Sequence, residues 1–231
     1  MLEVLIGQMR SAGGPILIAL FLVSIAALAV TIFKIVQFGR MGVGRSAAAR
    51  SAVSVWAAGD RARGMEIARS ELSPASLTVG AAMASLARHP NDRDRARELA
   101  AQTALDQLTT MSRHLRILES VVQAAPMMGL LGTVIGMISA FGELSASGGA
   151  IDPAALATGI WAALLTTAAG LAVAIPFYFV SVWLDSRVEE ERATMEAAIG
   201  AVLFSVPTDP AARPGTTDAP VAPLGGRAAT A

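Results

Sequence analysis

Two threonines in apolar surroundings are the residues of this chain best placed to do chemistry. Thr133 and Thr167 each lie seventeen residues from position 150, which sits in a short glycine-containing segment. If that segment joins two antiparallel helices that end near residues 142 and 158, each hydroxyl lies nine residues inside its helix, at a depth of about 13 Å. That depth is close to the middle of a bilayer core about 30 Å thick. A single threonine could bond to its own helix backbone, but a level pair predicts a polar wall that faces something other than lipid.

Small residues surround these threonines at helical spacing. The positions, at steps of three and four, are Gly129, Gly132, Gly136, Ala162, Thr166, Gly170 and Ala174. Small side chains let helices approach closely in lipid, so helix packing in an oligomer is the simpler interpretation of the glycines. The hydroxyl of Thr166 is grouped with those of Thr133 and Thr167 as a candidate ion pathway.

Several kinds of chemistry are not supported by the sequence. The chain has no cysteine and two histidines, His89 and His114, which lie in its polar part and are interpreted as solvated residues. There is no nucleophile–base pair and no metal-ligand cluster, so no catalytic residue, metal or cofactor is predicted and the chain is not interpreted as an enzyme. Its 18 basic and 18 acidic residues give no net charge, which argues against a nucleic-acid partner.

Three long apolar stretches indicate a membrane protein. Of the 231 residues, 54% are hydrophobic and 16% charged, and residues 11–33, 120–142 and 153–184 contain no charged residue. Each stretch reaches the roughly 20 residues that span a bilayer. The first could be a signal peptide cleaved after Ala29, but its apolar run continues to Phe33, which favours a retained helix. We predict membrane helices at 14–33, 120–142 and 158–184.

The distribution of basic residues predicts the orientation. Thirteen of the 18 lysines and arginines lie between the first and second spans, and none lies between the second and third. Because basic residues resist crossing the membrane, we expect residues 34–119 in the cytoplasm and the loop 143–157 in the periplasm. The segment 1–13 is then periplasmic, and residues 185–206 and 207–231 are cytoplasmic.

The polar region is helical in composition. Asn91 is a plausible N-cap, and nothing after it breaks a helix before Pro126, so one long helix is predicted to run from the polar region into the second span. Leu108, Met111 and Leu115 begin an apolar stripe along it. Residues 207–231 are rich in proline and alanine and are interpreted as a disordered tail, with 185–206 as a helical end.

The second and third spans resemble a known family. The sequence from Gly129 to Gly136 (GLLGTVIG), followed by that from Gly159 to Pro176 (GIWAALLTTAAGLAVAIP), is similar to the paired signature of the TolQ/ExbB/MotA proton-channel subunits, closest to the TolQ/ExbB branch. The order of one span, a cytoplasmic helical segment and two spans also fits, and the resemblance covers roughly residues 10–205.

This resemblance implies an all-α membrane protein that forms a homo-oligomer, pentameric in the family, around a central cavity. It implies a single-span partner of the ExbD/TolR type, whose intramembrane Asp carries protons, and a location in the bacterial inner membrane. The matching positions assign Thr133 and Thr167 to the pore lining. The function implied is a motor subunit that couples the proton motive force to work on the cell envelope or to import across the outer membrane. The residues do not indicate which process the motor drives, whether the ion is a proton or sodium, or how many subunits the complex contains.

One position departs from the family pattern. Where TolQ and ExbB have a glutamate in the third span, this chain has Ala162. No Asp, Glu, Lys, Arg or His lies in the three predicted spans, so a proton carrier would have to come from another polypeptide. The alternative is a nonconducting oligomeric scaffold that has lost the channel carboxylate.

Overall fold

The computed structural model describes residues 14–146 and 153–205, and within these ranges every regular element is an α-helix. In order, the helices are α2 (Gly14–Met41), α3 (Ala47–Ala57), α4 (Arg61–Ser70), α5 (Pro74–Arg88), α6 (Arg93–Ser112), α7 (Leu115–Ala146) and α8 (Pro153–Phe204). The prediction of an all-α protein is confirmed. The tail 207–231, the segment 1–13 and the middle of the loop predicted at 143–157 lie outside the described residues.

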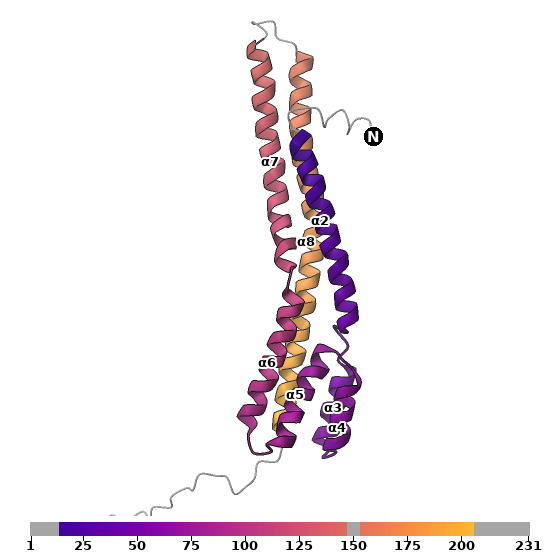
Figure 1. Ribbon diagram of the computed structural model, residues 1–231. Helices are drawn as coiled ribbons and strands as arrows, with labels where there is room; N and C mark the ends of the chain where they lie inside the picture. The colour runs from indigo at the N-terminus through magenta and orange to yellow at the C-terminus, as the bar shows by residue number, and fades with distance from the viewer. Residues whose placement is uncertain (1–13, 147–152, 206–231) are drawn as a thin grey trace, which may run out of the picture.

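The molecule is an elongated bundle built along α8 (Figure 1). One end consists of α7 and α8 side by side, with α2 packed against both, and we call it the apolar end. The other end consists of α3–α6 and residues 185–204 of α8, where α3, α5 and α6 contact α8 and α4 packs against α3 and α5, and we call it the polar end. Because α8 has 52 residues, it belongs to both ends and connects them without a joint.

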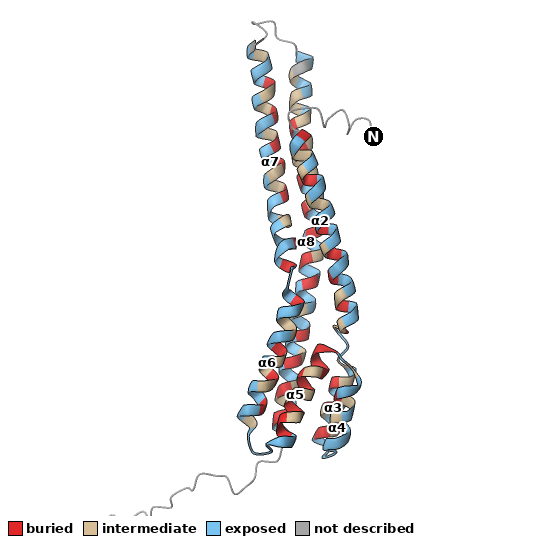
Figure 2. Cartoon of the chain, in the orientation of Figure 1, coloured by how far each residue is buried: buried red, intermediate tan, exposed pale blue. Residues whose placement is uncertain are grey.

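Three of the described helices are long and apolar enough to cross a membrane, in agreement with the sequence. Many of their large apolar side chains are exposed in the single chain, and Figure 2 shows many exposed residues along the apolar end. Examples are Phe21, Leu22, Leu130, Ile138, Trp161 and Phe179. Exposed apolar surface on this scale needs lipid or neighbouring protein to cover it, so the chain is a multi-pass membrane protein.

Local sequence explains where the helices of the polar end begin. The Asp60 carboxylate caps α4 by accepting from the backbone N–H of Arg63, and Ser73 caps α5, which has Pro74 in its first turn. At α6 the prediction of Asn91 as N-cap is wrong by one residue. Asp92 takes that position and accepts from the N–H of Arg95 at 2.9 Å.

Alanines and a few large side chains form the core of the polar end. Ala96, Ala100 and Ala104 recur every four residues along α6 and are buried, which allows close packing against α5. The remaining core includes Trp56 of α3 and Met195 of α8. This cluster makes the polar end a compact helical unit.

The predicted single helix from residue 92 into the second span is wrong. The chain leaves helical geometry between α6 and α7, where His114 has a φ of 71°. By contrast, α7 continues through Pro126, because a proline within a membrane helix removes only one backbone hydrogen bond and neighbouring helices compensate. At this break, side chains of α2 donate to the carbonyls of Met111 and Thr110.

A second difference concerns the first span. The helix α2 does not end near Phe33 but continues to Met41, so Lys34 lies on the same helix. Lys34 is fully buried. Residues 14–33 contain no charged residue, but the first membrane helix as a whole contains Lys34 and Arg40.

Candidate ion pathway

The α7–α8 hairpin is held at very close range by glycines. A Cβ built on Gly170 would lie 2.5 Å from the Ala125 carbonyl oxygen, and one on Gly136 would lie 3.0 Å from the Ala163 Cβ. A Cβ on Gly129 would lie 3.0 Å from the Thr167 Cα. Within the described residues these glycines therefore pack α7 against α8 of the same chain.

Thr166 lies inside this contact. It is fully buried, and its hydroxyl lies 2.6 Å from the Ala163 carbonyl oxygen and 3.1 Å from that of Gly129. A Cβ on Gly132 would collide with the same side chain. In the single chain Thr166 thus ties α8 to α7, and its place in an ion pathway remains a prediction.

The glycine contacts also determine the relative heights of Thr133 and Thr167. Gly132 opposes Thr166, Gly136 opposes Ala163 and Gly129 opposes Thr167. Since α7 and α8 are antiparallel, these pairs place Thr133 and Thr167 within about one helical turn, roughly 5 Å, of one another along the hairpin.

Both threonines lie on one flank of the hairpin. Each residue of a helix is rotated by about 100° from the one before. Residues just before the contact positions, such as Met128 and Ala169, pack in the cluster that contains Leu20 of α2. Thr133 and Thr167 directly follow the contact positions Gly132 and Thr166, so they lie on the flank opposite α2. We call this side the threonine flank.

The two hydroxyls of the threonine flank differ in their bonding. The Thr133 hydroxyl donates to the Leu130 carbonyl at 2.7 Å, within its own helix. The Thr167 hydroxyl is shielded in the single chain and finds no hydrogen-bond partner among the described residues. Thr133 also lines a shallow groove of about 590 Å³ that runs along α7 toward Ser145. The flank therefore contains one unpartnered, shielded hydroxyl, at Thr167, and one hydroxyl beside a groove, at Thr133.

Ala162 does not lie on the threonine flank. It is half-buried on α8, five residues before Thr167. Five residues correspond to a rotation of about 140°, so Ala162 faces away from the threonine flank within one chain. A carboxylate at this position would not point at Thr167 of its own subunit.

Two buried ionisable residues were not predicted from the sequence. Lys34 donates to the Met111 carbonyl at 2.6 Å, and Glu191 accepts from the backbone N–H of Gly44 at 2.8 Å. Both are almost completely buried. The only signal for Lys34 was its helical spacing with Gln37 and Phe38, which continues the first span beyond the apolar run.

Comparison with known proteins decides the family. Residues 70–197, which are more than half of the chain, match the MotA/TolQ/ExbB proton channel family. The chain belongs to this family. Both residues of the threonine flank and all four packing glycines fall inside the matched range.

Individual relatives agree with this assignment. The biopolymer transport protein exbB1 of Vibrio cholerae is 34% identical over 114 residues, which are 48% of this chain and 50% of that protein. A biopolymer transport protein ExbB of Helicobacter pylori is 41% identical over 80 residues, 34% of this chain and 54% of that protein. An ExbB homolog of Methanothermobacter thermautotrophicus is 40% identical over 90 residues, 39% of this chain and 31% of that protein. The matched segments thus span about a third to a half of these relatives. The matching family is described as one of proton channels, and these relatives are named as biopolymer transport proteins.

Proposed function

We propose that this chain is a subunit of a proton-channel motor in the bacterial inner membrane. The observation that carries the proposal is the threonine flank, where Thr133 and Thr167 lie at similar height on the side of the α7–α8 hairpin that α2 does not cover. The Thr167 hydroxyl is shielded in the single chain and has no partner among the described residues, and an unpartnered hydroxyl in the middle of a span is costly. A shared, hydrated cavity between copies of the hairpin would satisfy it.

The proton carrier in this proposal belongs to a partner. Among the described residues of the hairpin, no Asp, Glu, Lys, Arg or His lies between Ser120 and Gly142 or between Pro153 and Leu184. A titratable group is required to move protons through a narrow membrane site, so it must come from a single-span partner of the ExbD/TolR type that carries one intramembrane Asp. The threonine hydroxyls would then hydrogen-bond water or the partner's carboxyl group.

The assembly and topology complete the proposal. The copies form a homo-oligomer, pentameric as in the family, with the threonine flanks turned inward. The N-terminus lies in the periplasm and the polar end in the cytoplasm, where the excess of arginine between the first two spans would place it. The work performed is the energising of envelope maintenance or of import across the outer membrane. The names of the relatives, biopolymer transport proteins, favour such a role.

The decisive experiment measures proton flux in vesicles that contain the complex of this chain and its partner. Replacing the partner's intramembrane Asp with Asn should abolish flux, whereas Ala162→Glu should be tolerated if that position borders a wet cavity in the oligomer. If the Asp→Asn complex supports full function, proton coupling is not the activity, and the nonconducting scaffold, which the absence of the family glutamate at Ala162 favours, replaces it.

A further inference from the structure

The helix is interrupted at the joint between α6 and α7, although the sequence there lacks the usual helix breakers. The segment from Ser112 to Leu118 contains neither proline nor glycine. Arg113 nevertheless adopts φ −56° and ψ 133°, and His114 has a φ of 71°, a left-handed conformation that a residue with a Cβ rarely adopts.

The break exposes carbonyl groups, and α2 supplies donors for them. In a continuous helix the Met111 carbonyl would accept from the N–H of Leu115. Here the Lys34 ammonium donates to it at 2.6 Å and also to the Gln37 side chain at 2.9 Å. The Gln37 amide in turn donates to the Thr110 carbonyl at 3.4 Å. Two side chains of α2 thus replace bonds that the helix has lost.

The surroundings of Lys34 leave the joint as the main partner of its ammonium group. It is fully buried, and its ammonium lies 5.2 Å from the centre of the Phe38 ring. None of the ion pairs found among the described residues includes it. The backbone carbonyl of α6 is therefore its main partner, and a continuous helix would take that partner away.

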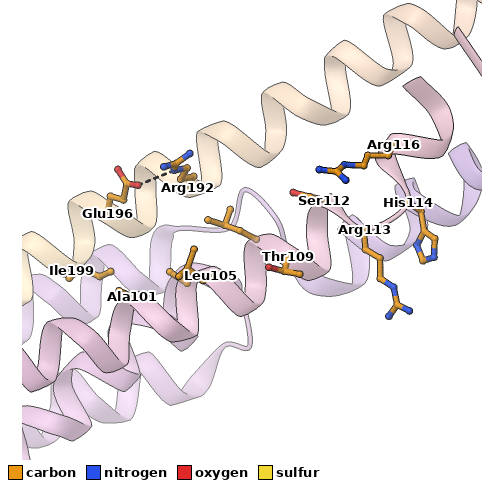
Figure 3. Close-up of a pocket in the computed structure, with 12 residues that line it drawn as sticks. Ala101, Leu105, Thr109, Ser112, Arg113, His114, Arg116, Arg192, Glu196 and Ile199 are labelled. Carbon is orange, nitrogen blue, oxygen red and sulfur yellow. Dashed lines mark hydrogen bonds and ion pairs between the residues drawn. The ribbon is translucent and has the colours of Figure 1, made fainter. Parts of the chain in front are cut away.

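The helix α2 also contacts His114. Its ring packs edge-on against Phe33, at 6.0 Å between ring centres. Figure 3 shows Arg113 and His114 projecting from the joint away from α8, while Arg116 extends on the other side beside Ser112. One stretch of α2, residues 33–38, therefore makes all of these contacts with the joint.

We propose that Lys34 is a positioning residue that holds the α6–α7 joint open and thereby sets the orientation of α7. Two states are available to the joint. In the open state Lys34 binds the Met111 carbonyl, and in the continuous state the N–H of Leu115 binds it. Closing the joint would turn α7 relative to α6, which is anchored in the polar end, and would move Thr133 relative to Thr167. The effect on flux rests on the proposed channel function, whereas the effect on the joint does not.

Hydrogen exchange of the full complex tests the state of the joint. The N–H groups of Leu115 and Arg116 are in the first turn of α7, and a continuous helix would protect them. In Lys34→Met we expect their exchange to slow by about tenfold or more. Arg40→Met removes an exposed cation from the same helix without touching the joint, and its exchange should match that of the wild type. Unchanged or faster exchange in Lys34→Met would overturn the proposal.

Substitutions at His114 test the same two-state equilibrium by changing how readily residue 114 adopts a positive φ. Alanine disfavours the left-handed conformation, so His114→Ala should slow the same amides even if Lys34→Met does not fold. Glycine adopts positive φ readily, so His114→Gly should restore fast exchange to the Lys34→Met chain. A purely structural role for Lys34 would predict no such rescue, and failure of the double variant to recover would contradict the two-state joint.

Measurements of proton flux distinguish the proposal about the α6–α7 joint from the proposed channel function. Lys34→Met should lower proton flux at least several-fold, and the added His114→Gly should recover it. If the joint closes but flux is unchanged while the partner's Asp→Asn abolishes it, the channel stands and the positioning role is wrong. If the partner's Asp→Asn has no effect, the channel function is wrong, and the exchange data still decide the state of the joint.

Discussion

At the scale of the residue, two adjacent threonines have different surroundings. Thr166 is buried between α7 and α8 and bonds to carbonyl groups of both helices. Thr167, one residue further, is rotated by about 100° onto the threonine flank and has an unpartnered hydroxyl. Removing the hydroxyl should therefore affect stability at Thr166 and proton flux at Thr167.

The prediction compares Thr166→Val with Thr167→Val, which both keep the shape of the side chain. Thr166→Val should lower the free energy of unfolding by about 1 kcal/mol, because it removes an interhelical hydrogen bond. Thr167→Val should leave stability unchanged and lower proton flux. Thermal unfolding in detergent and flux in vesicles measure the two effects. Equal stability losses in the two variants would contradict the assignment of the threonine flank.

The hairpin glycines support a second prediction. A Cβ on Gly170 would collide with the Ala125 carbonyl, whereas Gly200, on the same helix, has nothing within 4 Å of its Cβ position. Gly170→Ala should therefore destabilise the chain by about 1–3 kcal/mol, while Gly200→Ala should be neutral or slightly stabilising. Because these contacts lie within one chain, denaturation of the subunit should accompany any loss of the oligomer in native mass spectrometry. An oligomer that dissociates into stably folded Gly170→Ala subunits would show that Gly170 packs between copies.

At the scale of the element, the turn between α2 and α3 joins the first membrane helix to the polar end. Gly42 and Gly44 have φ values of 69° and 85°. The N–H of Gly44 donates to the buried carboxylate of Glu191 on α8. A hydrogen bond to a charged group is among the stronger ones, so this contact fixes the turn against the long helix.

The glycine conformation gives the third prediction. The Cβ position of Gly44 is in open space, so only its positive φ opposes a side chain. Gly44→Ala should cost about 1 kcal/mol of stability, because alanine is strained at positive φ. Gly39→Ala lies in the helical part of α2, also in open space, and should be neutral or stabilising. Chemical denaturation of the two variants measures the difference, and equal stabilities would argue against a left-handed residue at 44.

At the scale of the whole molecule, the orientation in the membrane can be measured directly because the chain has no native cysteine. Ser145 is exposed at the far end of α7, and Gln102 is exposed on α6 in the polar end. In intact cells with a permeable outer membrane, Ser145→Cys should react with a membrane-impermeant maleimide. Gln102→Cys should react only after the inner membrane is opened. The reverse pattern would invert the proposed topology.

The sequence by itself determined the class of the protein, its three membrane helices and its family. These properties follow from composition and from short-range periodicity, which local residues specify. The motif around Thr133 and Thr167 also predicted two threonines at similar height, because the symmetry of a hairpin about its turn depends only on counting residues.

Only the tertiary structure decided which contacts the small residues make and where the helices stop. Gly129, Gly132 and Thr166 could pack between copies or within one chain, and sequence spacing is the same in both cases. The break at His114 has no proline or glycine signal, and the side chains that donate to the carbonyls exposed there, Lys34 and Gln37, lie more than 70 residues away. Hydrogen bonds from distant side chains can offset the roughly 1–2 kcal/mol that a left-handed residue costs. Such contacts between distant parts of the chain leave no periodic signal in the sequence.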